Sequence, residues 1–152
     1  MRDYIIMTDS CCDLSQQEVE ELELTVLPLS FTIEGKTLLN TPDHADMSPE
    51  EFFAKIAAGA DCTTAAVNVG QFTDAMEKVL QEGKDILCVC FSSALSTTYQ
   101  SACIAAEDLR EKYPEAKILV IDSLSASRGQ GMLLYRAVRE RREKNLTIDE
   151  LD

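Results

Sequence analysis

The residues of this chain whose types and spacing could bind a ligand are clusters of hydroxyl side chains in polar turns. Ser10 follows an apolar run at residues 4–8, and residues 92–99, which read Ser-Ser-Ala-Leu-Ser-Thr-Thr-Tyr, follow another at residues 85–91. A third cluster, residues 122–131, follows the run at 117–121, and a fourth, residues 63–68, precedes a helix without an evident strand before it. Hydroxyl groups can donate hydrogen bonds to a carboxylate or phosphate without adding charge. These turns therefore predict a site for a small acidic ligand.

Each turn taken alone is explained equally well by hydroxyls that cap the helix behind it. Together the turns favour a site, because a parallel sheet brings its strand ends to one edge, where helix N-termini present free N–H groups and partial positive charge. Asp9 and Asp122 also stand at strand ends. Such an aspartate can hold a metal or act as a nucleophile, but more often it accepts hydrogen bonds that fix the turn. Arg128 is interpreted as a solvent-exposed residue of a first helical turn.

The elements that must position these turns alternate between strand and helix. Strands are predicted at residues 4–8, 25–33, 85–91 and 117–121. Helices are predicted to begin after the caps Ser15, Ser48 and Asn68, and to run through residues 99–113 and 131–144. Residues 34–47 read as a polar loop, and Pro28 predicts an edge or a bulge in the second strand. Continuously apolar strands alternating with helices predict an α/β fold with a three-layer, mostly parallel sheet flanked by helices, which binds ligands beyond the carboxyl ends of its strands.

Composition narrows the class of protein. The chain has 152 residues, about one domain, and a formal net charge of −13, which argues against nucleic-acid binding. It contains no apolar run of the roughly 18 to 20 residues that a membrane span needs, and no signal-peptide core. The six cysteines form no Cys-x-x-Cys pair and His44 is the single histidine, so no metal site and no cofactor are predicted. These features indicate a cytoplasmic protein with reduced thiols.

The usual catalytic motifs are missing. There is no Gly-x-x-x-x-Gly-Lys-Ser/Thr loop and no Gly-x-Ser-x-Gly elbow, and a thiol nucleophile at Cys11 or Cys12 would need a histidine that the neighbouring sequence does not offer. The main hypothesis is a binding protein that is not an enzyme. The alternative is an enzyme acting on a small phosphorylated or carboxylated metabolite, with Asp9 or Asp122 catalytic. A third possibility is a domain that mainly docks a partner protein.

The polar turns, taken in order, resemble those of the DegV family of fatty-acid-binding proteins. Residues 8–14, Thr-Asp-Ser-Cys-Cys-Asp-Leu, resemble the family's opening Thr-Asp-Ser-x-x-Asp-Leu, and residues 26–29 are similar to its second strand. Residues 92–102 resemble its Ser-Ser-x-Leu-Ser-Gly-Thr-Tyr-x-x-Ala. Residues 122–123 and 127–131 resemble its Asp-Ser followed by Ser-x-Gly-x-Gly. Four short motifs in the right order across the whole chain make the resemblance specific.

The resemblance implies a long-chain fatty acid whose acyl chain is buried and whose carboxylate is held by Ser and Thr hydroxyls. Thr64 or its neighbour Thr63 falls where the family has a head-group threonine, and Ser92 and Ser93 fall at its head-group serines. With the other strand-end hydroxyls, the predicted ligand-binding residues are Thr63, Thr64, Ser92, Ser93, Ser96 and Ser10. The resemblance also implies a partner, a fatty-acid kinase that phosphorylates the bound carboxylate.

Two departures from the family pattern and the end of the chain bear on these expectations. Thr97 replaces a family glycine, and residues 65–68, Ala-Ala-Val-Asn, replace its Ser-x-Pro-Ser. Thr147 to Glu150 form a capping box with only two residues behind it, and one turn of helix does not repay its nucleation. We therefore expect residues 1–152 to be the N-terminal α/β domain of a longer protein, with the family's C-terminal domain absent from this chain. The alternative is a frayed tail.

Overall fold

A four-stranded parallel sheet, sheet A, forms the middle layer of the computed structural model, which describes residues 2–151. Its strand order is β2-β1-β6-β7. The bounds are Tyr4–Asp9 for β1, Thr25–Leu27 for β2, Asp85–Cys90 for β6 and Ile118–Asp122 for β7. All four strands run parallel, so their carboxyl ends meet at one edge. The predicted α/β fold is confirmed.

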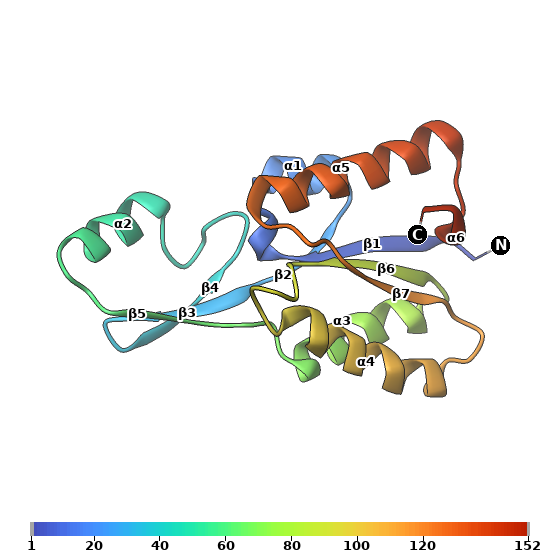
Figure 1. The fold of residues 1–152 in the computed structure, drawn as a ribbon, viewed down its shortest axis with the longest axis horizontal. Coiled ribbons are helices and arrows are strands. Elements are labelled where there is room, and N and C mark those ends of the chain that lie inside the picture. Colours follow the sequence, from blue (N-terminus) through green and yellow to red (C-terminus); the bar gives the residue numbers. More distant parts are fainter. Residues whose placement is uncertain (1, 152) are drawn as a thin grey trace.

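Helices cover both faces of sheet A, as Figure 1 shows. One face carries α3 and α4, and the other carries α1 and α5, with the short α6 near the N-terminus. The bounds are Gln16–Glu21 for α1, Val69–Gln81 for α3, Thr98–Lys112 for α4, Ser127–Lys144 for α5 and Ile148–Leu151 for α6. A 3-10 turn, η1 (Ser10–Cys12), follows β1 directly. The caps predicted at Ser15 and Asn68 both form complete capping boxes.

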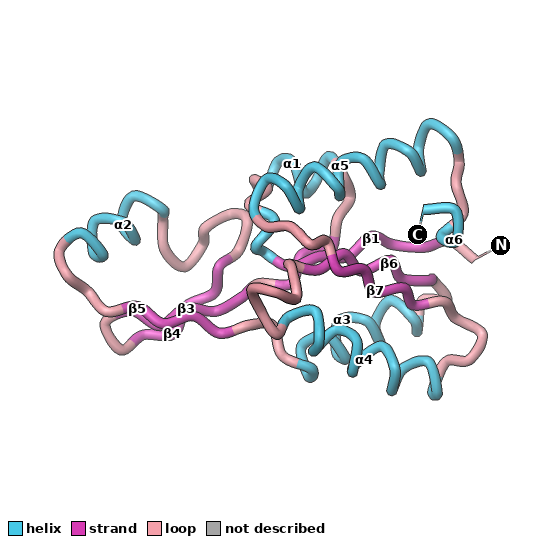
Figure 2. Tube along the Cα trace, viewed as in Figure 1, coloured by secondary structure: helices cyan, strands magenta, loops and turns pink. Residues whose placement is uncertain are grey.

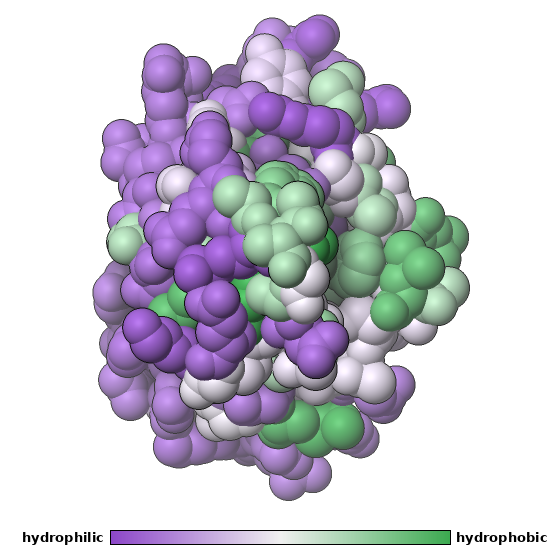
Figure 3. Space-filling view, turned by 90° about the vertical axis from the view of Figure 1, so that its left-hand side faces the viewer, coloured by the Kyte–Doolittle hydropathy of each residue, from purple (hydrophilic) through white to green (hydrophobic). Residues whose placement is uncertain are grey.

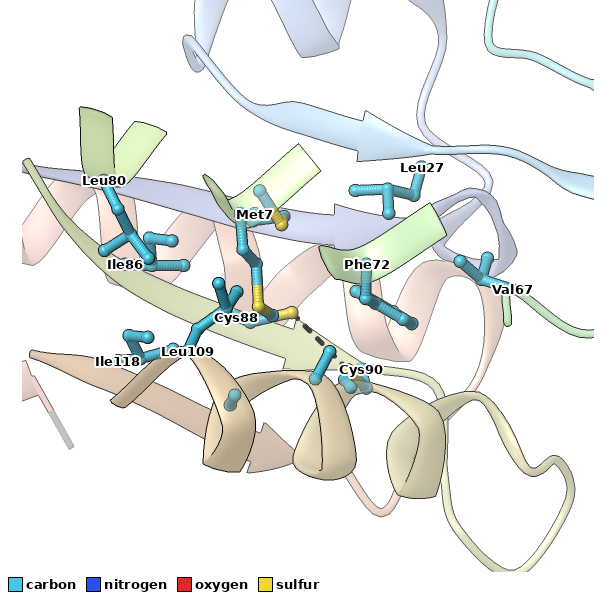
Figure 4. Close-up of a cluster of buried hydrophobic side chains, with 14 of the residues drawn as sticks. Met7, Leu27, Val67, Phe72, Leu80, Ile86, Cys88, Cys90, Leu109 and Ile118 are labelled. Carbon is cyan, nitrogen blue, oxygen red and sulfur yellow. Dashed lines mark hydrogen bonds between the residues drawn. The ribbon is translucent and has the colours of Figure 1, made fainter. Parts of the chain in front are cut away.

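The core explains why the central strand reads as continuously apolar. All six residues of β6 are buried, because helices pack on both of its faces. Figure 4 shows Cys88 and Cys90 among the apolar side chains on the α3 and α4 side, with their sulfur atoms 3.6 Å apart. Both are free thiols. They serve as small core residues, as the sequence predicted.

A second, antiparallel sheet projects from one end of this body, and Figure 2 shows its three strands separated from sheet A. Its strand order is β4-β3-β5, and α2 lies beside it (Figure 1). The bounds are Leu29–Ile33 for β3, Lys36–Asn40 for β4, Pro49–Ala57 for α2 and Cys62–Ala65 for β5. We call residues 29–65 the lobe. Its chain leaves sheet A at Pro28 and returns into α3.

Four sequence-based predictions about these elements were wrong. Residues 25–33 form two strands in different sheets, because Pro28 lacks the N–H that would continue the ladder of sheet A. The loop predicted at residues 34–47 contains β4, which pairs with β3. The turn predicted from Thr63 begins inside β5. The last long helix starts at Ser127, four residues before the predicted Gly131. The edge predicted from Pro28 is correct, since β2 is an edge strand.

The helix of the lobe keeps its predicted cap but buries little. The Ser48 side chain accepts a hydrogen bond from the Glu51 N–H, and Pro49 occupies the first turn. Phe52 packs edge-to-face on Phe31 of β3, with ring centroids 5.4 Å apart. Its neighbour Phe53 is 67% exposed, and no residue of α2 is buried. The lobe therefore presents apolar surface to solvent.

Candidate functional site

The carboxyl edge of sheet A is organised by Asp9, the last residue of β1. One carboxylate oxygen, Oδ2, accepts a 2.7 Å hydrogen bond from the Phe91 N–H just beyond β6. The other, Oδ1, accepts from the Cys11 N–H at 3.0 Å and from Nε2 of Gln130 at 3.3 Å. Asp9 is fully buried, and burial raises the pKa of its carboxyl group against these hydrogen bonds, which lower it. Asp9 thus fixes the turn after β1, which is the more common role of an aspartate at the end of a strand.

The loops after β6 and β7 are hydrogen-bonded to each other. The Ser92 N–H donates to the Ser125 carbonyl at 3.0 Å, and the Ser93 N–H donates to Oδ1 of Asp122 at 3.1 Å. The same oxygen of Asp122 accepts from the Leu124 N–H at 3.0 Å. The two hydroxyl-rich turns therefore form one continuous surface at the sheet edge, as the parallel topology predicts.

The three predicted serines of the first loop differ in their surroundings. Ser92 is buried, and its hydroxyl accepts from the Ala94 N–H at 3.3 Å. The Ser96 hydroxyl accepts from the Thr98 N–H at 3.2 Å and lies 2.9 Å from the Thr98 hydroxyl. Ser93 is exposed, so its hydroxyl is the one of the three that faces solvent. Thr97, which replaces a family glycine, has a φ of −78°, and the substitution causes no backbone strain.

Ser10 follows the carboxyl end of β1 directly and is the first residue of η1. Its hydroxyl accepts from the Leu29 N–H at 3.0 Å and from Nδ2 of Asn40 at 3.3 Å, which connects β1 to the lobe. It also lines a groove of about 270 Å³ together with Asn40, His44 and Arg128. Arg128 is exposed, as predicted, and forms an ion pair with Glu18. None of the other five predicted ligand-binding residues lines this groove.

Thr63 and Thr64 lie on β5, where successive side chains point to opposite faces of the sheet. Thr64 is paired with Phe31, the residue that packs on α2, so Thr64 shares the face that α2 covers. Thr63 is paired with Thr32 on the opposite face. Both are exposed. One ligand head group can therefore be reached directly by only one of the two.

The cysteines of the first turn are poor nucleophiles. Burial raises the pKa of the Cys11 thiol to about 12 and that of the Cys12 thiol to about 11, with the nearby carboxylate of Asp9 acting in the same direction. Within residues 2–151, no three His, Cys, Asp or Glu side chains are grouped so that they could hold a metal ion. No helix in this part of the chain is long and apolar enough to cross a membrane.

Sequence reasoning missed the apolar side chains at this edge. Leu95 and Leu124, in the loops after β6 and β7, are 66% and 79% exposed. Leu124 has a φ of +50°, a left-handed conformation that is unfavourable for a leucine. Figure 3 looks at the lobe end of the molecule and shows apolar surface gathered in its centre and along one side. The available signal is a leucine inside each hydroxyl-rich turn.

The fold and its edge define a three-layer α/β domain with an antiparallel lobe and hydroxyl-bearing loops at the carboxyl ends of its strands. The family model described as "Uncharacterised protein, DegV family" matches residues 4–151. The chain belongs to the DegV family, and the resemblance seen in its turns is confirmed. A DegV domain-containing protein of Clostridium perfringens is 37% identical over 151 residues, and one of Lactococcus lactis is 39% identical over 138 residues. These matches cover 99% and 91% of the chain.

Solved structures give the same fold. A protein of Eubacterium ventriosum described as a stearic-acid-binding protein matches with a TM-score of 0.86 and 28% identity, over 97% of this chain and 50% of that one. A DegV family protein of Thermus thermophilus, described by its fatty-acid binding, matches with a TM-score of 0.84 and 30% identity, over 99% of this chain and 51% of that one. The chain spans about half the length of the curated relatives it matches.

Proposed function

We propose that the intact protein binds a long-chain fatty acid at the carboxyl edge of sheet A. The observation that carries the proposal is the position of Ser93, an exposed hydroxyl in a loop that also exposes Leu95 and is hydrogen-bonded to the loop of Leu124. A hydroxyl beside apolar side chains matches a ligand with a polar head and an apolar chain. The fatty-acid binding described for the solved relatives of Eubacterium ventriosum and Thermus thermophilus supports this choice of ligand.

The predicted residues have different roles in this proposal. Ser93 and one of the two threonines of β5 donate hydrogen bonds to the carboxylate. Ser92 and Ser96 hold the loop in shape, because their hydroxyls accept hydrogen bonds from backbone N–H groups of the same loop. Ser10 fixes the lobe against β1 through the Leu29 N–H and contributes to the polar surroundings of the head group.

The head group and the chain contribute differently to affinity. Each buried methylene is worth about 0.8 kcal/mol, so a chain of a dozen or more carbons supplies most of the binding free energy. A hydrogen bond to a charged group adds about 1.5–3 kcal/mol and fixes the orientation of the ligand. Exposed leucines at the sheet edge therefore matter as much to the proposal as the hydroxyls.

The proposal also concerns what the protein does with its ligand. It is a cytoplasmic binding protein that is not an enzyme and has no cofactor, and it presents the carboxylate of the fatty acid to a fatty-acid kinase. The alternative, an enzyme that uses Asp9 or Asp122, is less well supported. Both carboxylates accept hydrogen bonds from backbone N–H groups and thereby hold turns. Asp9 accepts one from Phe91, and Asp122 accepts one each from Ser93 and Leu124.

Lipid extraction tests the ligand. The intact protein is purified, extracted with organic solvent, and the extract is analysed by mass spectrometry for fatty acids at a stoichiometry near one. A second sample is stripped of lipid and incubated with oleate. A protein that carries no fatty acid after purification and takes up none on incubation would refute the proposal.

A further inference from the structure

A single carboxylate, that of Asp122, joins the two loops that carry Ser93 and Leu124. Asp122 is the last residue of β7 and is aligned with Cys90 at the end of β6. Oδ1 of Asp122 accepts two backbone hydrogen bonds, one from the Ser93 N–H at 3.1 Å and one from the Leu124 N–H at 3.0 Å. We propose that Asp122 is a positioning residue for Ser93 and Leu124 that also sets the selectivity of the site between ionised and uncharged head groups.

The positioning role follows from the backbone. A leucine with a φ of +50° is in the unfavourable left-handed region, so this conformation must be held by its surroundings. The hydrogen bond from the Leu124 N–H to Asp122 spans two residues, the pattern by which an aspartate stabilises a turn. The position of the exposed Leu124 side chain and that of the Ser93 backbone therefore both depend on Asp122.

The selectivity role follows from the place of the Asp122 charge beside Ser93. The Ser93 N–H lies 3.1 Å from Oδ1 of Asp122, so this carboxylate is next to the residue that we propose holds the head group. The Ser93 hydroxyl is exposed and can donate its proton to a ligand. A ligand carboxylate on Ser93 therefore lies close to a second negative charge, and the two charges repel each other.

Little in this part of the chain offsets the charge of Asp122. Among residues 2–151 it takes part in none of the ion pairs, which join other residues. The pKa of Cys90 in β6 is raised mainly by Cys88 and that of Tyr99 in α4 mainly by Cys103, and the charge of Asp122 acts on both in the same direction. Cys90 and Tyr99 are therefore uncharged at neutral pH and do not offset the charge of Asp122. An ionised ligand thus meets a repulsion that an uncharged head group of the same size does not.

The test measures a ratio of affinities. The inference rests on the proposed function, so the intact protein is titrated at pH 8 with oleate and with oleyl alcohol, which share one acyl chain. Asp122→Asn keeps an oxygen that can accept the two N–H groups but removes the charge. We expect this substitution to strengthen oleate binding about tenfold relative to oleyl alcohol. Asp122→Ala removes both loop hydrogen bonds and weakens the binding of both lipids.

The control is Asp108→Asn, which removes the same charge from the exposed face of α4. We expect the ratio of the oleate and oleyl alcohol affinities of this variant to stay at the wild-type value. If Asp122→Asn changes both affinities by the same factor, or neither, the inference is wrong although the proposed function stands. If the wild-type protein binds neither lipid, the proposed function fails and the inference fails with it.

Discussion

Asp9 and Phe91, which are 82 residues apart in the sequence, are joined by a 2.7 Å hydrogen bond from the Phe91 N–H to Oδ2 of Asp9. The bond connects the end of β1 to the first residue after β6, where the loop of Ser92 and Ser93 begins. The Asp9 carboxylate that accepts this hydrogen bond is fully buried, so competition with water does not weaken the bond. The position of the candidate head-group loop therefore depends on a residue that is itself out of reach of a ligand.

Substitution of Asp9 by asparagine tests this connection. The amide has one oxygen where the carboxylate has two, so its NH₂ group faces a backbone N–H and one buried donor loses its acceptor. We expect the free energy of unfolding to fall by about 1–3 kcal/mol, measured by urea denaturation at pH 7. Asp108→Asn, on the surface, serves as the control. Equal stability of the Asp9 variant and the wild type would show that the bond contributes little.

The reactivity of Cys11 tests the surroundings of the same turn. Because burial raises the pKa of its thiol to about 12, almost no thiolate is present at pH 8. We expect iodoacetamide to modify Cys11 of the native protein more slowly than the same residue in urea, and the native rate to keep rising above pH 9. Peptide mass spectrometry follows the modification. Rapid alkylation of Cys11 at pH 7 in the folded protein would contradict this prediction.

Gly131 of α5 tests the packing of that helix on η1. A Cβ at this position would lie 2.9 Å from Cδ2 of Leu14 and 3.1 Å from the backbone carbonyl oxygen of Cys12. The leucine can adjust, but the carbonyl belongs to the turn after β1. We expect Gly131→Ala to destabilise the fold by about 1–3 kcal/mol in thermal or urea unfolding. Met132→Ala, at the next and largely exposed position, changes stability by less than about 0.5 kcal/mol.

The two threonines of β5 give a prediction about the ligand. Because they point to opposite faces, valine substitutions that keep the side-chain shape should have unequal effects. We expect one of Thr63→Val and Thr64→Val to weaken oleate binding about tenfold and the other to leave it within twofold. Fluorescence displacement of a lipid probe measures both. Equal losses would mean that neither hydroxyl contacts the head group directly.

Sheet A and its helices could be predicted because their signals are local. Every residue of β6 is buried, so a continuously apolar run identifies it, and the boxes at Ser15 and Asn68 mark helix starts within four residues. The parallel topology predicts that the turns after β1, β6 and β7 meet at the carboxyl edge of sheet A, and the structure has them there.

The lobe could not be predicted, because its strands are defined by their pairing. β4 has no buried residue, and β5 has three exposed residues out of four, so neither shows the alternation that identifies a strand. The register of β5 with β3 comes from contacts distant in sequence, such as Phe31 with Thr64, whereas β4 pairs with β3 across the two-residue turn at Glu34 and Gly35. The exposure of Leu95 and Leu124 was hidden for a similar reason, since apolar loop residues are usually buried against the body of a protein.

In the function proposed for this protein, the Ser93 hydroxyl holds the head group of a bound fatty acid. The most direct test of this role is the affinity of the intact Ser93→Ala protein for oleate, compared with the wild type and with Ser101→Ala on α4 as a matched control. We expect binding about ten- to hundredfold weaker for Ser93→Ala, with unchanged unfolding and with Ser101→Ala like the wild type. Wild-type affinity of the folded Ser93→Ala protein would contradict it.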